Sequence, residues 1–325
     1  MKTSTRIAAA LSAAALGVGL TACAADQGGT SADGSFAPSG DASMIVPFSA
    51  GGGSDASGRA IAAGLEGATG TNVIVENREG GSGAVGYSYL LSQEGDDQTL
   101  LAAETSLSSI PLSQDVDFTA TSFTPVAKIG EDATLLVVPA SSPFQTCSDV
   151  TTAAGAGSVV VAVSGAVSLD EVVFRLIETE TGVTFDRVPY ESGGEVLTGL
   201  LGGQVQVASL NPGEVVGQLE SGDLRALCAV AEERYTDYPE LADIPTATEQ
   251  GIDVAFTQWR GFIGAGGMSP EARTYWADAA EAWTQTPEYE EYISSNYMQP
   301  VTAYGEELDA YLAEYDAQLA TAIGR

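Results

Sequence analysis

The chain has 325 residues, of which 44% are hydrophobic, and a formal net charge of −32 with no histidine. This acidity argues against a nucleic-acid partner, because no basic track could follow a phosphate backbone, and by default it reflects solubility or salt tolerance. The lack of histidine excludes a Ser-His-Asp triad, a Cys-His pair and a histidine-ligated metal, and no calcium-loop pattern is present, so we predict neither a metal nor a cofactor.

The N-terminus has the pattern of an exported lipoprotein. Lys2 and Arg6 precede an apolar, alanine-rich segment over residues 7–20, which is too short for a lasting membrane span. The run Leu20-Thr21-Ala22-Cys23 resembles the lipobox of bacterial lipoproteins. We therefore predict a signal peptide over residues 1–22 and a lipid anchor on Cys23, on the outer face of the cytoplasmic membrane or in the periplasm. A plain secretory signal cut elsewhere is the alternative.

The rest of the chain divides into a tether and a folded body. Residues 23–41 are mostly Gly, Ser, Ala and Asp, which predicts a flexible tether. Residues 42–325 are long enough for one large domain or two smaller ones. No later apolar run in the sequence is long enough to predict a membrane span.

A glycine-rich loop joins the first predicted strand, residues 44–46, to the first predicted helix. The glycines at residues 51–53 let the backbone approach a ligand closely, and the helix N-terminus that follows favours an anion. The alternative is a plain turn in which Ser54 or Asp55 only caps the helix.

A second glycine cluster follows the next predicted strand, residues 71–76. Gly81, Gly83 and Gly86 fit the G-x-G-x-x-G pattern of dinucleotide-binding folds. The pattern is short, glycine is abundant in this chain, and nicotinamide cofactors are scarce outside the cell membrane. We therefore do not predict a dehydrogenase.

The remaining sequence alternates between short predicted strands and helices, which indicates an α/β fold with sheets covered by helices. After lipidation of Cys23, Cys147 and Cys228 remain, either as a disulfide or as two buried small hydrophobes. Strands are predicted at residues 99–102, 125–129, 134–138, 159–163, 185–188, 205–209 and 224–230, and helices at 148–156, 169–181, 195–201, 212–219 and 270–284.

Several of these segments together resemble one protein family. The run Val46-Pro47-Phe48-Ser49-Ala50-Gly51-Gly52-Gly53-Ser54-Asp55 resembles the first ligand loop of the tripartite tricarboxylate transporter substrate-binding proteins, also called Bug receptors. The resemblance continues in family order, across nearly the whole mature chain, through residues 75–78, 188–195, 224–227, 244–246 and 259–262.

The resemblance implies a periplasmic-binding-protein type II architecture, in which two α/β domains joined by a hinge close on a ligand in the cleft between them. The first domain would comprise residues 42–138 plus 257–325, and the second would be the inserted residues 139–256. The family also implies a receptor rather than an enzyme. It would be a monomer that captures a small carboxylate, such as citrate or another di- or tricarboxylate, and delivers it to integral-membrane permease subunits.

The same resemblance places ligand-binding residues in loops of both domains. Arg260 is the cation expected near the ligand, because its planar fork suits a carboxylate, and pairing with an acidic neighbour is its alternative role. The ligand-binding residues that the resemblance implies are Phe48, Ser49, Gly52, Gly53, Ser54, Asp55, Gly81, Ser82, Gly83, Ser164, Gly165, Ser168, Tyr190, Ser192, Gly193, Gly194, Ser209, Asn211 and Arg260.

Departures from the family pattern leave the identity of the ligand open. Glu79 stands where proline is usual, Leu169-Asp170 replaces a pair of small or histidine-like residues, and Glu191 replaces a common lysine. An added acid could repel a highly charged anion or bind an ammonium group, so an amino acid or an aromatic carboxylate is the alternative ligand. Less favoured classes are a surface interaction lipoprotein and an exported hydrolase that uses carboxylates.

The predicted anchor gives a direct test. The substitution Cys23→Ala should release the protein into the medium, because an acidic chain is repelled by anionic lipid headgroups and would keep no other attachment. Fractionation of cells that express either form measures this, and retention of the variant on the cells would contradict the anchor.

Overall fold

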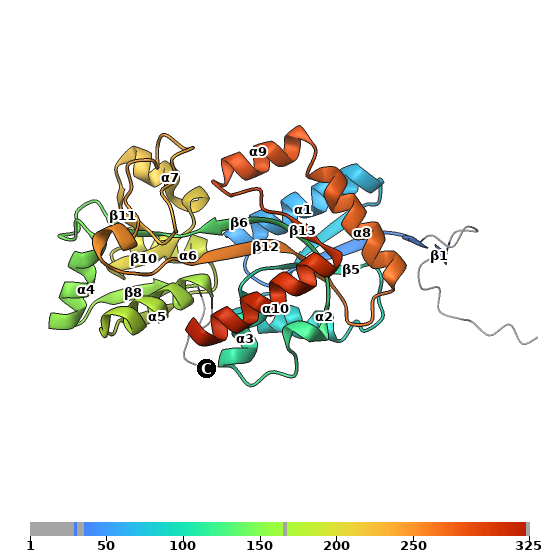
Figure 1. Cartoon of the computed structure of the whole chain (residues 1–325), viewed down its shortest axis with the longest axis horizontal. Helices are drawn as coiled ribbons and strands as arrows, with labels where there is room; N and C mark the ends of the chain where they lie inside the picture. Colours follow the sequence, from blue (N-terminus) through green and yellow to red (C-terminus); the bar gives the residue numbers. More distant parts are fainter. Residues whose placement is uncertain (1–28, 31–35, 165–167, 323–325) are drawn as a thin grey trace, which may run out of the picture.

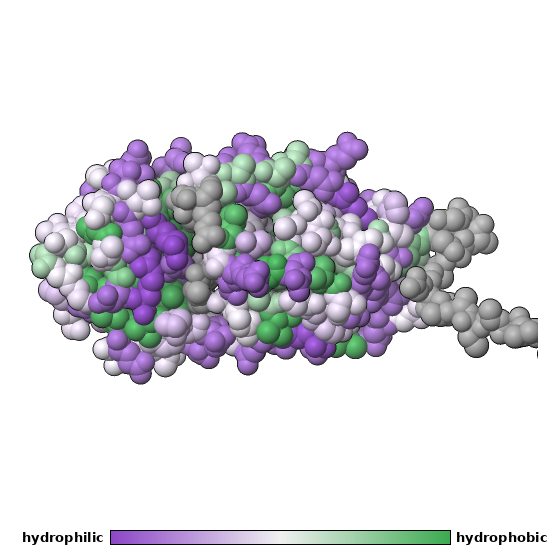
Figure 2. Space-filling view, turned by 90° about the horizontal axis from the view of Figure 1, so that it is seen from below, coloured by the Kyte–Doolittle hydropathy of each residue, from purple (hydrophilic) through white to green (hydrophobic). Residues whose placement is uncertain are grey.

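The computed structural model describes residues 29–30, 36–164 and 168–322. The chain forms two lobes, each a β-sheet covered by helices, so the predicted α/β class is confirmed (Figure 1). Figure 2 shows hydrophilic residues over much of the visible face and hydrophobic residues in scattered groups. Among the helices that the structure describes, none combines the length and apolar character needed to cross a bilayer.

The first lobe is built on a six-stranded sheet in which the three strands at one end pair in parallel and the remaining pairings are antiparallel. Its spatial order is β13 (Ala303–Tyr304), β6 (Thr124–Ala133), β12 (Thr257–Gly264), β5 (Thr99–Ala103), β3 (Ala42–Val46) and β4 (Val73–Asn77). Its helices are α1 (Gly53–Thr69), α2 (Ala84–Leu91), α3 (Ser106–Ser113), α8 (Pro270–Trp283), α9 (Pro287–Ser295) and α10 (Gly305–Ala322).

The second lobe is built on a five-stranded sheet with the order β11 (Leu224–Ala229), β7 (Leu135–Pro139), β10 (Val207–Leu210), β8 (Val160–Val163) and β9 (Asp186–Pro189). Its helices are α4 (Cys147–Ala156), α5 (Leu169–Thr181), α6 (Gly193–Leu201) and α7 (Pro212–Ser221). Because β8, β9 and β10 run parallel, the connections from their C-terminal ends to α5, α6 and α7 gather at one edge of the sheet.

In the described chain, the path passes from the first lobe to the second and back. It leaves the first sheet at Ala133 and enters the second at Leu135, so the predicted boundary after residue 138 falls inside β7, a strand of the second sheet. It returns at Thr257, where β12 begins. Thr134 and the segment before Thr257 therefore connect the two lobes.

Helix α1 is packed closely enough to fix the position of its N-terminus. A Cβ atom at Gly58 would lie 2.5 Å from the Val46 side chain, and one at Gly64 would lie 2.3 Å from the Trp283 ring. Leu65 is fully buried beside them. Since the glycines leave no gap between the helix, the sheet and α8, the start of α1 cannot shift without moving the core.

Helix boundaries follow the caps in the sequence. The predicted helix over residues 169–181 coincides with α5, which starts after Ser168 and ends at Gly182, in the left-handed region with φ 72°. The helix predicted over residues 195–201 begins two residues earlier, at Gly193. The Ser192 side chain accepts a hydrogen bond from the Glu195 N–H and so caps the helix before its two glycines.

The end of the predicted tether is packed on the first lobe. The buried Phe36 ring meets Tyr275 of α8 edge-on, with centroids 5.4 Å apart. The Ser39 N–H donates to Oε1 of Gln98 at 2.7 Å. The packed part of this lobe therefore includes Phe36 and Ser39, which precede the predicted start at residue 42.

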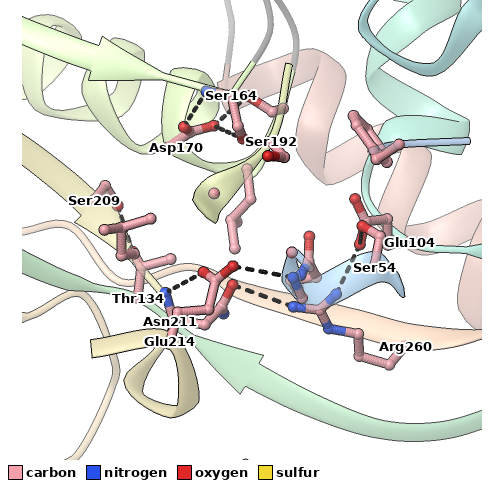
Figure 3. Close-up of a pocket in the computed structure, with 18 residues that line it drawn as sticks. Ser54, Glu104, Thr134, Ser164, Asp170, Ser192, Ser209, Asn211, Glu214 and Arg260 are labelled. Atoms are coloured by element: carbon pink, nitrogen blue, oxygen red, sulfur yellow. Dashed lines mark hydrogen bonds and ion pairs between the residues drawn. The ribbon is translucent and has the colours of Figure 1, made fainter. Parts of the chain in front are cut away.

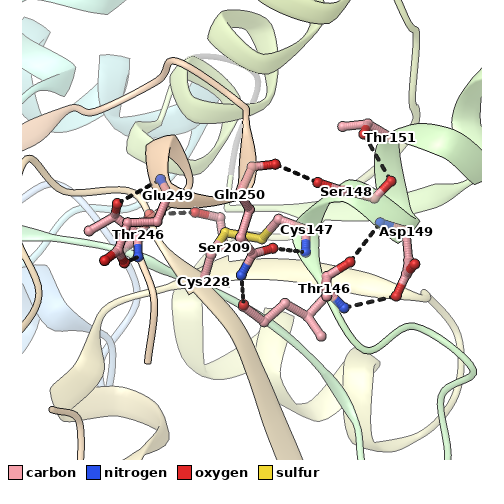
Figure 4. Close-up of a disulfide and its surroundings, with 12 residues drawn as sticks. Thr146, Cys147, Ser148, Asp149, Thr151, Ser209, Cys228, Thr246, Glu249 and Gln250 are labelled. Atoms are coloured by element: carbon pink, nitrogen blue, oxygen red, sulfur yellow. Dashed lines mark hydrogen bonds between the residues drawn. A yellow bond between two sulfur atoms is a disulfide. The ribbon is translucent and has the colours of Figure 1, made fainter. Parts of the chain in front are cut away.

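A disulfide joins Cys147, the first residue of α4, to Cys228 in β11, which decides between the two roles left open by the sequence (Figure 4). Both cysteines are fully buried. Gln250 reinforces the connection, since its side chain accepts the Cys147 N–H at 2.7 Å and donates to the Leu227 carbonyl at 2.7 Å. The disulfide therefore ties a helix of the second lobe to the edge of its sheet.

Loss of this disulfide should destabilise the second lobe. The cysteines are 81 residues apart, and closing a loop of that length in the unfolded chain corresponds to about 4 kcal/mol of stabilisation. Replacing both residues (Cys147→Ser with Cys228→Ser) should lower the unfolding free energy by roughly that amount. Urea unfolding with and without reductant measures it. The double variant should be insensitive to reductant, and a wild-type midpoint that reductant does not move would contradict the prediction.

Candidate functional site

A cavity lies between the two lobes, where loops from both sheets meet (Figure 3). Its volume is about 50 Å³, room for only a few water molecules. The lining residues are Phe48, Gly52, Gly53, Ser54, Glu104, Thr134, Ser164, Ser168, Leu169, Asp170, Ser192, Gly193, Ser209, Leu210, Asn211, Glu214, Gln258 and Arg260.

Helix N-termini from both lobes converge on this cavity. Helix α1 begins at Gly53, α5 at Leu169 and α6 at Gly193, and Asn211 is the N-cap of α7; all four residues line the cavity. Each helix start presents backbone N–H groups that have no partner in their own helix, together with the positive end of the helix dipole. The arrangement suits an anion.

A carboxylate of the protein already occupies one of these helix starts. Oε1 of Glu214, in the first turn of α7, accepts the N–H of Gly53 across the cavity at 3.0 Å, and Oε2 accepts the N–H of Asn211 at 3.3 Å. Burial raises the pKa of Glu214, although Arg260 and these hydrogen bonds oppose the shift. A Cβ at Gly193 would lie 2.3 Å from Oε1, so a larger residue there would push the Glu214 carboxyl group out of this position. Glu214 thus connects α7 of one lobe to α1 of the other.

Arg260 projects from β12 and is only 4% exposed. It forms ion pairs with Asp132 at 2.9 Å and with Glu104 at 2.8 Å. It also donates to Oδ1 of Asn211 across the cavity at 3.1 Å, and Figure 3 shows Arg260 between Glu104 and Asn211. Burial alone would lower the pKa of Arg260, but the two carboxylates raise it overall. The structure therefore pairs this cation with acidic neighbours, the alternative role that the sequence left open.

Asp170 closes the start of α5. Its carboxyl group accepts hydrogen bonds from the Ser164 and Glu171 N–H groups and from the Ser164 and Ser168 hydroxyls. Burial raises the pKa of Asp170 to about 7, because the loss of solvation outweighs these hydrogen bonds. The two serine hydroxyls predicted for the ligand are thus engaged by an acid that the sequence analysis treated only as a departure from the family.

The cavity brings together the larger part of the predicted ligand-binding set. Gly165 lies outside the described residues. The predicted residues that line the cavity are Phe48, Gly52, Gly53, Ser54, Ser164, Ser168, Ser192, Gly193, Ser209, Asn211 and Arg260.

Asp55 does not reach the cavity and instead organises the first glycine loop. It accepts hydrogen bonds from the Gly51 N–H at 3.0 Å, from Arg59 at 3.0 Å and from Asn77 at 2.9 Å. Burial alone would raise the pKa of Asp55, but these hydrogen bonds lower it overall. Because its carboxylate has these three hydrogen-bond partners, Asp55 fixes the conformation of the glycine loop.

Other predicted residues also lie off the cavity because they have partners elsewhere. Ser49 donates to Glu79, and the Tyr190 hydroxyl donates to Gln204 at 3.1 Å. The second glycine cluster forms a short 3₁₀ turn, Gly81–Gly83, which includes Ser82. Gly194 lies beside the cavity where the lobes meet, and a Cβ there would lie 3.5 Å from the Gly51 carbonyl oxygen.

The cavity is also lined by polar residues that were not predicted for it, which include Glu104, Thr134, Gln258 and Glu214. Glu104 directly follows β5, and a polar residue at the C-terminal end of a buried parallel strand is a usable signal for a site. Glu214 stands three residues after Asn211, the spacing of a capping box, which predicts a local cap and not a contact with the other lobe.

Asp170 should make stability depend on pH. Its pKa of about 7 in the folded chain, against an ordinary value of 3.8, means that the folded state keeps a proton that the unfolded state releases between these values. Wild-type stability should therefore fall as pH rises from 4 to 7. The unfolding free energy of Asp170→Asn, measured relative to that of wild type, should increase by up to about 4 kcal/mol between pH 4 and pH 8.

Urea unfolding at both pH values measures this gain. The matched control is Asp149→Asn at the exposed start of α4, where hydrogen bonds from Gln145 and Thr146 lower the pKa of the carboxyl group. The unfolding free energy of that variant, relative to wild type, should not increase over the same pH interval. A pH-independent difference for Asp170→Asn would contradict the prediction.

Comparison with known proteins agrees with this geometry. The family model for the tripartite tricarboxylate transporter family receptor matches residues 58–323. Protein BugT of Bordetella pertussis is 28% identical over 240 residues, which cover 70% of this chain and 71% of that protein.

Two solved structures extend the comparison to the fold. A TctC solute-binding protein from Polaromonas, solved without ligand, is 27% identical with a TM-score of 0.65 and covers 88% of this chain and 99% of its own. A protein of R. palustris solved with adipate is 25% identical with a TM-score of 0.81 and covers 88% of this chain and 98% of its own. Since the family model spans most of its length, the chain belongs to the tripartite tricarboxylate transporter receptor family.

Proposed function

We propose that this receptor captures a small carboxylate outside the cytoplasmic membrane and delivers it to the integral-membrane subunits of a tripartite tricarboxylate-type transporter. The observation that carries the proposal is the convergence of the α1, α5, α6 and α7 N-termini on one cavity between the lobes. The R. palustris relative, solved with the dicarboxylate adipate, gives independent support.

Donors for a ligand carboxylate lie on both sides of the cavity. Ser54 brings a hydroxyl from α1 that donates to Glu104 at 2.8 Å here and would turn to the ligand on binding. Ser192 accepts the Glu195 N–H and keeps its own hydrogen to donate. Nδ2 of Asn211 is buried without a hydrogen-bond partner among the described residues. Micromolar binding needs about 8 kcal/mol, and a hydrogen bond to a charged group contributes roughly 1.5–3 kcal/mol, so about four such contacts are comparable with the requirement.

Ligand entry requires the lobes to separate. The cavity of about 50 Å³ holds only a few waters. Two contacts close it, from the Gly53 N–H to Glu214 and from Arg260 to Asn211. Opening breaks both, and closure on a ligand restores them or replaces them with contacts to the ligand.

The finer parts of the proposal concern the ligand and the attachment to the membrane. The family implies a di- or tricarboxylate such as citrate, with an amino acid or aromatic carboxylate as the alternative. Cys23 would carry the lipid anchor, and the segment before Phe36 would let a monomeric receptor reach its permease.

Ser54 should contribute directly to ligand affinity. Isothermal titration with citrate, succinate, malate, adipate and glutamate identifies the tightest ligand. For that ligand, Ser54→Ala should weaken binding at least ten-fold, because the hydroxyl that would turn from Glu104 to the charged ligand is lost.

The matched control is Ser57→Ala, one turn further along α1. The Ser57 hydroxyl does not line the cavity and forms a hydrogen bond of 2.7 Å with the Tyr292 hydroxyl. This variant should retain wild-type affinity. Equal affinities of wild type and Ser54→Ala would remove Ser54 from the site, and no binding of any carboxylate to wild type would refute the proposed function.

A further inference from the structure

The walls of the cavity carry an excess of negative charge. Glu104, Asp170 and Glu214 line it, and Asp132 lies behind them against Arg260. Among the described residues that line the cavity, Arg260 is the one with a positive side chain. Glu104 and Asp132 contact the guanidinium and Glu214 lines the same cavity, so acidic groups outnumber the cation even without Asp170, whose pKa of about 7 leaves it partly protonated. A ligand that brought only negative charge would meet a repulsion that burial strengthens.

The groups that would attract an anion are already engaged. Arg260 donates through Nη1 to Glu104 and through Nη2 to Asp132 and Asn211. The start of α1 holds the Glu214 carboxylate, and the start of α5 holds that of Asp170. A ligand carboxylate at either helix would have to displace a carboxylate of the protein.

Two atoms at the cavity keep unused bonding capacity. Oε2 of Glu104 accepts from Ser54 at 2.8 Å and from Arg260 at 2.8 Å, whereas its Oε1 has no partner within the described chain, although the residue is only 7% exposed. Nδ2 of Asn211 is the second such atom. The two terminal nitrogens of one guanidinium bind Oε2 of Glu104 and Oδ1 of Asn211, so the side chains that carry these two atoms are held next to the same cation at the cavity.

We propose that the ligand carries a protonated amine close to its carboxylate, with the ammonium on Glu104 and the carboxylate on the Asn211 amide and the start of α6. The inference rests on the proposed function and names the ligand class within it, a zwitterionic amino acid and not a di- or tricarboxylate. The ammonium offsets part of the acid excess and satisfies Oε1 of Glu104 by a charge-assisted hydrogen bond. Glu104 is then the residue that determines specificity.

Matched pairs of ligands test this on the wild-type protein. Each α- or β-amino acid with a single carboxylate is compared by isothermal titration with the hydroxy acid of the same carbon skeleton, as alanine is with lactate. The tightest amino acid should bind at least ten-fold better than its hydroxy acid, because only the ammonium distinguishes them. If hydroxy acids or dicarboxylates bind as well or better, this inference is overturned and the proposed function stands. If neither set binds, both fail.

A substitution at Glu104 assigns the preference to a residue. Glu104→Gln keeps the size of the side chain and its contacts with Ser54 and Arg260 but removes its charge. The substitution should lower the affinity for the amino acid at least ten-fold and leave the affinity for the hydroxy acid unchanged or higher. Glu195→Gln, in the first turn of α6 with its carboxylate bonded to the Glu191 N–H outside the cavity, should change neither affinity. Equal loss of both ligands in Glu104→Gln would overturn the assignment, and the wild-type comparison does not depend on the variant folding.

Discussion

The buried guanidinium of Arg260 is the constraint on which the cleft depends. A charge removed from water in this way is tolerated only with charged and hydrogen-bonded partners, which here are Glu104, Asp132 and Asn211. The first two belong to the lobe of Arg260, and Asn211 begins α7 of the other lobe. The interaction that neutralises the cation therefore also sets how the lobes meet. Because loss of one partner leaves a buried charge unpaired, the positions of these groups are coupled.

Glu214 adds a second connection of the same kind. One of its oxygens caps its own helix, and the other accepts the first N–H of α1 across the cavity. The protein thus places a carboxyl group of its own at the start of α1, a position that favours anions. A closed arrangement supported by internal contacts lowers the apparent affinity of a ligand that must first open it, in proportion to the fraction of open molecules. The affinity of this receptor is therefore set by the difference between its own contacts and those of the ligand.

The sequence predicted the features whose causes are local. Helix α5 could be placed because its apolar positions recur at helical spacing within one segment, and Gly182 ends it there in the left-handed region. The loop glycines could be assigned to a cleft through the resemblance. The contacts that determine the electrostatics could not, since Gly53 and Glu214 are 161 residues apart, and Glu104 and Arg260 are 156 apart. A capping glutamate looks the same in sequence whether its second oxygen faces solvent or another lobe.

The acids at the helix starts serve the fold and restrict the ligand at once. Asp170 closes α5 and Glu214 closes α7, contributions that for helix caps amount to roughly 0.5–2 kcal/mol each. Open helix starts would give up that stability and gain sites for anions. In this chain the acids fill those sites, and Glu104 keeps an oxygen without a partner among the described residues. The selectivity of such a cleft is therefore decided less by how many helix N-termini it gathers than by which of them the protein's own carboxylates leave free.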